Sequence, residues 1–382
     1  MNVLFLQQGL GYGGASQSLI QMQKAIRGKV NIRTILKKNK RLNQQLKHLL
    51  SASEDIVEMH IPGVHSYPEG ISSEQEWRLV KQFQPEELVS YINKYQIDIL
   101  HVNSSVFSSL YKYIKEHTQV KIITHVREVI PQASDMVTQF IIEQIRLYSD
   151  FIICIADEES IHFKDLANCQ VLTNPVDTDY FHPNNKREND PVVIGMMANF
   201  NPLKGHDTFI EVANKTSLLC KRNVRFELLG MPSSGLLSWK EWLPIKSLGY
   251  FQQVKAMIRR SGGAHLRVIP FQADVKPIIQ NWHLALRMER SMKPWGRDVL
   301  ECMAMGIPVI ALGSSEVMIK NEETGWLVER NEVNLVVDQL IKCINDPEKM
   351  QRVATNARNW AVQNVGTSEY ADSILKIYND IQ

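Results

Sequence analysis

The chain has 382 residues, of which 44% are hydrophobic and 22% are charged, and its formal net charge is +2. This composition is typical of a soluble globular protein and excludes a low-complexity chain. The length is too great for one ordinary hydrophobic core and predicts two domains. No apolar run approaches the roughly 20 residues that a membrane span needs. The first residues lack the basic start and the apolar length of a signal peptide, so we expect a cytoplasmic protein.

The first part of the chain has an unusual charge distribution. No aspartate or glutamate precedes Glu54, whereas nine lysines and arginines lie between Lys24 and Lys47. This pattern predicts a basic face over residues 24–47. Such a face is either an ordinary solvated surface or one that attracts an anionic partner, namely the inner face of an anionic membrane or a phosphorylated acceptor. We expect no nucleic acid as a partner.

The five cysteines are odd in number, scattered, and never spaced as C-x-x-C. Several of them lie within apolar runs. This arrangement favours buried thiols in a reducing compartment over disulfides or a zinc site.

In chain order, short apolar strands alternate with amphipathic helical stretches over the first half of the sequence. The expected strands cover residues 2–6, 31–36, 56–60, 97–102, 121–125 and 151–155. The expected helices between them include residues 16–27, 85–94 and 134–148. This alternation predicts a mostly parallel, doubly wound α/β sheet.

A polar, proline-bounded segment over residues 174–183 is interpreted as an interdomain linker. A second α/β series follows it, with strands expected over residues 191–197, 225–229, 266–271, 284–288, 308–312 and 325–328. Helices are expected to close the chain over residues 331–344, 347–364 and 368–381. We therefore predict two Rossmann-like α/β domains, residues 1–175 and residues 184–367.

A glycine-rich segment connects the first expected strand to the first expected helix. Gly9, Gly11 and Gly14 fit the dinucleotide-binding pattern G-x-G-x-x-G. That site also needs an acidic residue at the end of the second strand, where this chain has Lys37 and Lys38. NAD binding, and with it an oxidoreductase, is therefore the weaker interpretation, and a tight strand-to-helix turn is the structural alternative.

The most informative stretch reads KPWGRDVLECMAMGIPVIAL, from Lys293 to Leu312. It predicts a glycine-bearing loop, a helix that starts near Arg297, and an apolar strand from Val309. Free backbone N–H groups and the helix dipole favour an anion at such a helix start.

This stretch resembles the C-terminal signature of the family-4 retaining glycosyltransferases of the GT-B fold. The family pattern is Glu-x7-Glu followed by Ala-Met-Ala-x-Gly-x-Pro-Val-Ile-Ala. Glu301 takes the second glutamate position, and residues 303–311 match closely. Residues 174–183 are similar to the family linker, and Lys204 with Gly205 to its phosphate-binding loop.

The resemblance implies two domains facing each other across a cleft, with residues 368–382 returning to the first domain. The second domain would bind a nucleotide-sugar donor, most simply a UDP-sugar. The first domain would bind the acceptor, whether a sugar, a lipid-linked molecule or a small molecule. The family reaction retains the anomeric configuration and uses neither a metal nor a cofactor.

The resemblance also assigns roles to single residues. His125 would lie near the transferred sugar. Lys204 would neutralise the departing diphosphate, and Glu301 would hold the ribose hydroxyls. The remaining donor-binding candidates fall into three groups. They are Gly13 and Gly14 of the glycine-rich segment, Trp295, Gly296 and Arg297 at the start of the helix near Arg297, and Asn199 and Lys293, which differ from the family pattern.

The two differing positions concern the chemistry itself. Asn199 stands where the family has an arginine, and Lys293 stands where it has the first glutamate. An asparagine brings no charge, and a lysine ammonium group cannot accept hydrogen bonds from sugar hydroxyls. A catalytically silent GT-B protein that acts as a binding partner is therefore the alternative function. Asp177 and Asp179 form a D-x-D pair, for which a metal site is the weaker interpretation.

Overall fold

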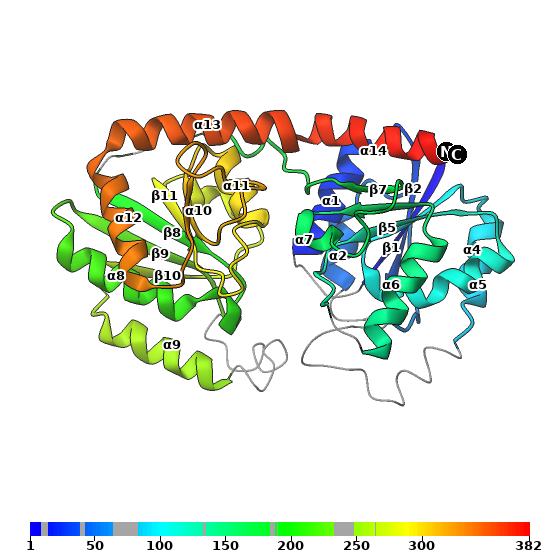
Figure 1. Cartoon of the computed structure of the whole chain (residues 1–382), viewed down its shortest axis with the longest axis horizontal. Helices are drawn as coiled ribbons and strands as arrows, with labels where there is room; N and C mark the ends of the chain where they lie inside the picture. Colours follow the sequence, from blue (N-terminus) through cyan, green and yellow to red (C-terminus); the bar gives the residue numbers. More distant parts are fainter. Residues whose placement is uncertain are drawn as a thin grey trace. The chain divides into compact units, whose positions relative to one another are not determined.

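The computed structural model describes residues 1–8, 14–38, 43–63, 83–132, 135–183, 188, 190–232, 248–263 and 265–382. The chain divides into two compact units (Figure 1). Unit 1 comprises Met1–Pro175 and Thr367–Gln382, and unit 2 comprises Val176–Gly366.

Unit 1 is built on a seven-stranded sheet in the order β3-β2-β1-β4-β5-β6-β7. Every pair of neighbouring strands is parallel. The strands are β1 (Asn2–Gln7), β2 (Asn31–Lys37), β3 (Asp55–Met59), β4 (Ile99–Val102), β5 (Lys121–Val126), β6 (Phe151–Cys154) and β7 (Cys169–Val171). The central strands are almost wholly buried because helices cover both faces of a parallel sheet.

The helices of unit 1 follow its strands in alternation. They are α1 (Gly14–Ile26), α2 (Asn43–Leu49), α4 (Glu86–Lys94), η1 (Ser105–Leu110), α5 (Tyr111–His117), α6 (Met136–Tyr148), α7 (Asp157–Ser160) and α14 (Thr367–Ile381). One apolar cluster lies on each face of the sheet. The last helix, α14, packs into the same cluster as α1, which places the C-terminal segment within unit 1.

Unit 2 has a six-stranded sheet in the order β10-β9-β8-β11-β12-β13, again wholly parallel. Its strands are β8 (Val192–Met197), β9 (Val224–Met231), β10 (Leu266–Pro270), β11 (Leu284–Arg287), β12 (Val309–Leu312) and β13 (Trp326–Val328). Its helices are η2 (Pro202–Lys204), α8 (His206–Leu219), α9 (Leu248–Arg260), α10 (Lys276–Ile279), α11 (Arg297–Ala304), α12 (Val333–Asn345) and α13 (Pro347–Val365).

The observed strands coincide with all twelve that the sequence predicts, to within a few residues. The short edge strand β7 was missed, because three residues are too few for an alternating pattern to show. The α/β fold class with two Rossmann-like sheets is confirmed. In the described parts of the chain, no helix has both the length and the apolar character that crossing a bilayer requires.

Candidate active site

In unit 2, charged side chains gather where β8 and β11 end. The carboxyl ends of parallel strands meet at one edge of a sheet, and α/β proteins bind ligands at that edge. The loop after β8 leads through η2 into α8, and the loop after β11 leads into α11. Both segments therefore reach the edge at neighbouring strands.

Lys204 is the last residue of η2, and only Gly205 separates it from the start of α8. The short turn is fixed at its start by Asn201, whose side chain accepts a hydrogen bond of 2.9 Å from the backbone N–H of Leu203. Gly205 then adopts φ +69°, and a Cβ there would lie 2.3 Å from the carbonyl oxygen of Met288. Only glycine permits this close approach of the β8 loop to the segment after β11.

The ammonium group of Lys204 pairs with Glu289, whose side chain is buried. Arg287, the last residue of β11, lies 3.4 Å from the same carboxylate. The Nη1 atom of Arg287 also donates to both carboxylate oxygens of Asp298, at 2.6 Å each. Two cations and two carboxylates thus form one connected group at the edge of the sheet.

Arg287 also shapes the loop before α11. Its Nε atom donates to the carbonyl oxygen of Lys293 at 2.8 Å. A Cβ on Gly296 would lie 2.5 Å from the Asp298 carboxylate and 2.9 Å from Nη1 of Arg287. The glycine therefore lets the backbone lie directly against this ion pair. Trp295, next to it, is buried.

Arg297 begins α11, and Glu301 lies one turn later. The Nε and Nη2 atoms of Arg297 contact the Oε1 atom of Glu301 at 3.2 and 2.7 Å. Burial raises the pKa of the Glu301 carboxyl, and the Arg297 charge opposes this shift. The predicted ribose ligand is therefore a buried carboxylate already held by a cation, rather than a solvated residue of the helix surface.

The two positions that differ from the family pattern, Asn199 and Lys293, differ in their exposure and in their contacts. Asn199 follows β8 and is exposed. Lys293 is half-buried, and its backbone rather than its side chain holds Arg287. A third arginine, Arg290, pairs with Asp207 in the first turn of α8. The segment after β11 thus brings Arg290 to the β8 loop, where its Nη1 atom also donates to the carbonyl oxygen of Pro202 at 3.2 Å.

Unit 1 carries a polar network at the carboxyl ends of β1, β4 and β5. Arg127, just after β5, donates to Asn103 at 2.6 Å and to Asn174. Asn103 in turn donates to Gln7 at the end of β1. These bonds tie the carboxyl ends of three neighbouring strands together and give the edge a fixed arrangement of polar groups.

His125 lies within this network and is fully buried. Its Nδ1 atom is 3.2 Å from Nε2 of His101 on β4 and 3.3 Å from Nη2 of Arg127. Burial, followed by the Arg127 charge, holds the pKa of His125 well below its ordinary value. The residue is therefore neutral at physiological pH.

The glycine-rich segment is only partly described. Gly9, Gly11 and Gly13 lie outside the described residues. Gly14 is the first residue of α1, and a Cβ there would meet nothing within 4 Å. The proposed close approach of the backbone to a phosphate therefore rests on the undescribed glycines, and it stays a prediction.

Of the two aspartates of the D-x-D pair, Asp177 has a structural role. Asp177 accepts a hydrogen bond of 2.8 Å from the backbone N–H of Tyr180, which closes a turn at the start of unit 2. Among the residues that the structure describes, no three histidine, cysteine, aspartate or glutamate side chains are placed to hold a metal ion. The metal interpretation of Asp177 and Asp179 thus finds no support in this part of the chain.

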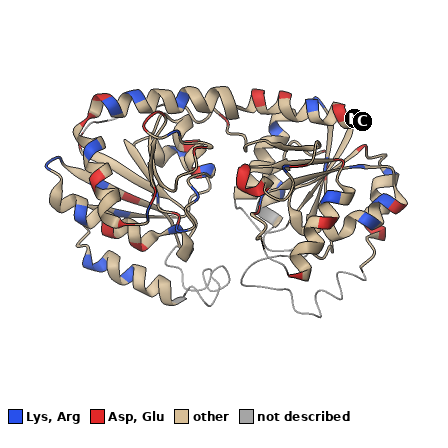
Figure 2. Cartoon of the chain, viewed as in Figure 1, with Lys and Arg blue, Asp and Glu red and all other residues tan. Residues whose placement is uncertain are grey.

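The basic stretch of the first unit is partly neutralised by acidic neighbours. Lys47 pairs with Glu58 at 2.8 Å, and Arg33 lies 3.4 Å from Glu54. Basic and acidic residues are mixed along the helices of this unit (Figure 2). Lys40 and Arg41 lie outside the described residues. Membrane contact through residues 24–47 stays a prediction.

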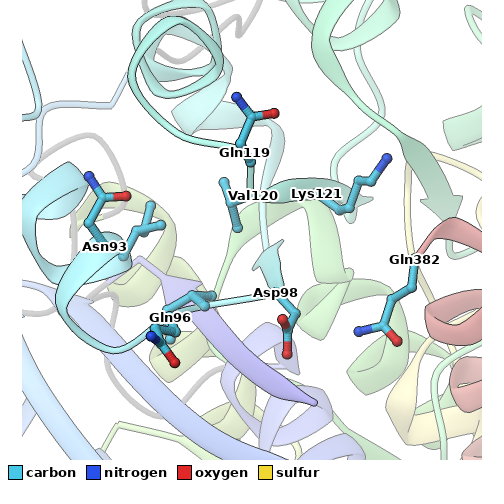
Figure 3. A pocket seen from close by; sticks show the side chains of 9 residues that line it. Asn93, Gln96, Asp98, Gln119, Val120, Lys121 and Gln382 are labelled. Carbon is cyan, nitrogen blue, oxygen red and sulfur yellow. The ribbon is translucent and has the colours of Figure 1, made fainter.

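A polar cavity of about 470 Å³ lies at the opposite edge of the unit 1 sheet, near the amino ends of β4 and β5 (Figure 3). Asp98 and Lys121 line it together with Gln119. The Asp98 carboxylate already accepts a hydrogen bond of 2.6 Å from the backbone N–H of Asn2. The cavity is remote from the carboxyl ends of the strands, so we assign it no part in the candidate site.

Sequence reasoning missed several site residues. In unit 2 these are Arg287, Glu289, Arg290 and Asp298, and in unit 1 they are Asn103 and Arg127. In the sequence, such residues can be recognised only by their position, since a charged residue stands at or just after the end of a buried apolar strand, as in the segment LALRMER. Which of these charges meet depends on contacts between separate loops, which no single segment reveals.

Residues 177–360 match the family model of the glycosyl transferases group 1, and this range lies within unit 2. The second unit is a group 1 glycosyltransferase domain. The charged group around Lys204 and Arg287 belongs to this domain, as do Gly296 and Glu301. The resemblance to group 1 glycosyltransferases is thus confirmed, whereas retention of configuration stays a prediction.

Solved structures similar to this chain share its fold at low sequence identity. HepE from Anabaena in complex with UDP is 18% identical, with a TM-score of 0.79 and 100% of each chain covered. A glycosyltransferase from Rickettsia africae is 18% identical, with a TM-score of 0.76 over 100% of this chain and 98% of that one. Sucrose-phosphate synthase from Thermosynechococcus elongatus is 14% identical, with a TM-score of 0.77 over 100% and 99%. The predicted GT-B fold is confirmed. No curated protein sequence matches the chain.

Proposed function

We propose that the protein transfers a sugar from a nucleoside-diphosphate sugar, most simply a UDP-sugar, to an acceptor hydroxyl. The single observation that carries this proposal is the group 1 match over the unit whose sheet edge holds Lys204, Arg287 and Glu301. HepE was crystallised with UDP and with UDP-glucose, which supports UDP as the nucleotide. Retention of configuration and independence of metal are part of the same proposal.

Negative charge grows on the leaving diphosphate during transfer, and cations aimed at that position stabilise the transition state. Lys204 is the proposed cation, although it pairs with Glu289 in the structure. A donor phosphate would take the place of this carboxylate. Arg287 lies against Glu289 as well and would keep it paired when Lys204 turns to the phosphate. The network therefore makes the exchange possible without leaving a buried charge alone.

The start of α11 is proposed to hold the rest of the nucleotide. Backbone groups around Gly296 offer donors to a phosphate, since the first N–H groups of a helix have no partner within it. Glu301, as an ionised carboxylate, would accept hydrogen bonds from the ribose hydroxyls. Its pairing with Arg297 favours the ionised form against the effect of burial.

Unit 1 is proposed to bind the acceptor. His125 and Arg127 lie at the carboxyl edge of its sheet, and Asn103 holds Arg127 there. Because His125 is neutral, it would act as a hydrogen-bonding group towards the sugar or the acceptor. The departing phosphate would take the acceptor proton, so no side-chain base is required. This assignment of the two units stays a proposal.

The proposal is tested by measuring the melting temperature with UDP, GDP, ADP, TDP, CDP and NAD in turn. A ligand present at about 100 times its dissociation constant adds about 2.7 kcal/mol to the stability of the folded state. We expect a clear rise with UDP, and donor turnover with a panel of acceptors then identifies the reaction. A rise with NAD alone would contradict the proposal and favour an oxidoreductase.

The catalytically silent alternative rests on Asn199 and Lys293. The test is the double substitution Asn199→Arg with Lys293→Glu, which restores both family residues. If only the double variant hydrolyses or transfers the donor sugar, the protein binds nucleotide sugars without turning them over. If the unsubstituted chain is active, the two family residues at positions 199 and 293 are not required for turnover, and the silent alternative fails.

A further inference from the structure

Three buried aromatic side chains of unit 1 form a line that ends at His125. Tyr378 of α14 lies with its hydroxyl 2.8 Å from Nδ1 of His101, and Nε2 of His101 lies 3.2 Å from Nδ1 of His125. All three residues have no exposed surface. The line joins the last helix of the chain to the carboxyl edge of the sheet through neighbouring strands β4 and β5.

The position of each proton along this line follows from Arg127. A guanidinium group only donates hydrogen bonds, and its Nη2 atom lies 3.3 Å from Nδ1 of His125. Nδ1 of His125 must therefore be the unprotonated, accepting nitrogen. His101 approaches the same nitrogen, so its Nε2 atom carries a proton and donates. Both distances are long for such bonds, as expected when two donors share one lone pair.

The same reasoning extends to Tyr378. Burial holds both imidazoles neutral, lowering the pKa of His101 to about 3 and that of His125 well below its usual value. With its proton on Nε2, His101 has an accepting Nδ1 atom. Burial raises the pKa of Tyr378 well above its ordinary value, so its hydroxyl keeps the proton that it donates to His101.

We propose that Tyr378 and His101 are positioning residues that, together with Arg127, fix His125 as the neutral tautomer protonated on Nε2. This inference rests on the proposed function for its consequence but not for its geometry. The Nε2 atom of His125 is buried and has no hydrogen-bond partner in the described part of the chain. When protonated, this Nε2 atom would donate a hydrogen bond to an oxygen atom, such as that of a hydroxyl group of the transferred sugar or of the acceptor.

The tautomers are measured directly by NMR on the full chain labelled with 15N at histidine. We expect both His101 and His125 to show a pyridine-like Nδ1 and a protonated Nε2 at pH 7. Spectra of His101→Gln and His125→Gln assign the signals. A protonated Nδ1 on His125, or a doubly protonated ring, would overturn the proposal.

The substitution Tyr378→Phe removes only the hydroxyl at the end of the line. We expect the Nδ1-protonated form of His101 to become populated and the His125 signals to shift. The matched control is Tyr370→Phe on the same helix, since Tyr370 is equally buried but its hydroxyl contacts Met22. If both variants give the same histidine spectrum, Tyr378 has no positioning role.

Transfer kinetics provide the functional readout. Loss of one buried hydrogen bond predicts a fall in kcat of about three- to tenfold for Tyr378→Phe, with the KM for the donor unchanged. Tyr370→Phe should keep the kcat of the unsubstituted protein, and an equal fall in both variants would refute the positioning role. If no transfer occurs in any variant, the proposed function fails, whereas the NMR result still decides the tautomer. The two failures are therefore distinguishable.

Discussion

Arg287 holds the loop before α11 of unit 2 together, and its removal should destabilise that unit. The substitution Arg287→Met keeps most of the side-chain volume but deletes every polar contact. Asp298 then loses both of its 2.6 Å bonds, and the carbonyl oxygen of Lys293 loses its 2.8 Å donor. Glu289 keeps Lys204 as its partner.

The expected magnitude follows from how buried these groups are. Removing one partner of a buried ion pair costs about 3–5 kcal/mol. The side chain of Arg287 is 10% exposed, but that of Asp298 is 22% exposed and regains some water. We therefore expect a loss near the lower limit, about 3 kcal/mol. For a unit of this size, such a loss lowers the melting temperature by about 6–12 °C.

Thermal unfolding followed by tryptophan fluorescence measures this change. The matched control is Arg267→Met, because Arg267 also pairs with a buried glutamate, at 3.2 Å, but is itself 65% exposed. The guanidinium of Arg267 is largely in water, and Glu227 keeps the indole N–H of Trp282 as a donor at 2.9 Å. A pair with one well-exposed partner contributes little, about 0–1 kcal/mol, so this control should melt close to the unsubstituted protein. Equal melting temperatures for the two variants would refute the view that Arg287 is a structural centre of the site.

Three further predictions concern the donor. Lys204→Ala should lower kcat by roughly 100-fold, which is the effect typical of losing one group that stabilises developing charge. The control Lys215→Ala, on the exposed side of α8, should leave kcat unchanged. Equal rates in both variants would show that Lys204 is not at the phosphate. Gly296→Ala places a Cβ 2.5 Å from the Asp298 carboxylate and should weaken UDP binding by about tenfold or more, measured by calorimetry; unchanged affinity would place the nucleotide elsewhere. Because burial raises the pKa of Glu301, its carboxylate is protonated at a higher pH than that of an exposed glutamate, so UDP affinity should decrease as the pH falls through that pKa and Glu301→Gln should remove the dependence. A Gln variant with the same pH profile would contradict the ribose role.

Local sequence patterns were sufficient for the fold. Each strand of a parallel sheet is buried on both faces, so its apolar run stands out against the amphipathic helices on either side. The strand at Val309–Leu312 and the helix at Arg297–Ala304 were located within a residue or so for this reason. Gly296 and Glu301 were found because they sit within one continuous motif.

The partners of the site residues were decided only by tertiary structure. Lys204 meets Glu289 across 85 residues of sequence, and His101 meets Tyr378 across 277. Electrostatic and hydrogen-bonding energies depend on distances of a few ångströms between side chains, and burial changes their strength. The sequence by itself determined which elements form and in which order, since that information is local. The sheet edges, which bring the ends of distant strands together, decided which charges face each other.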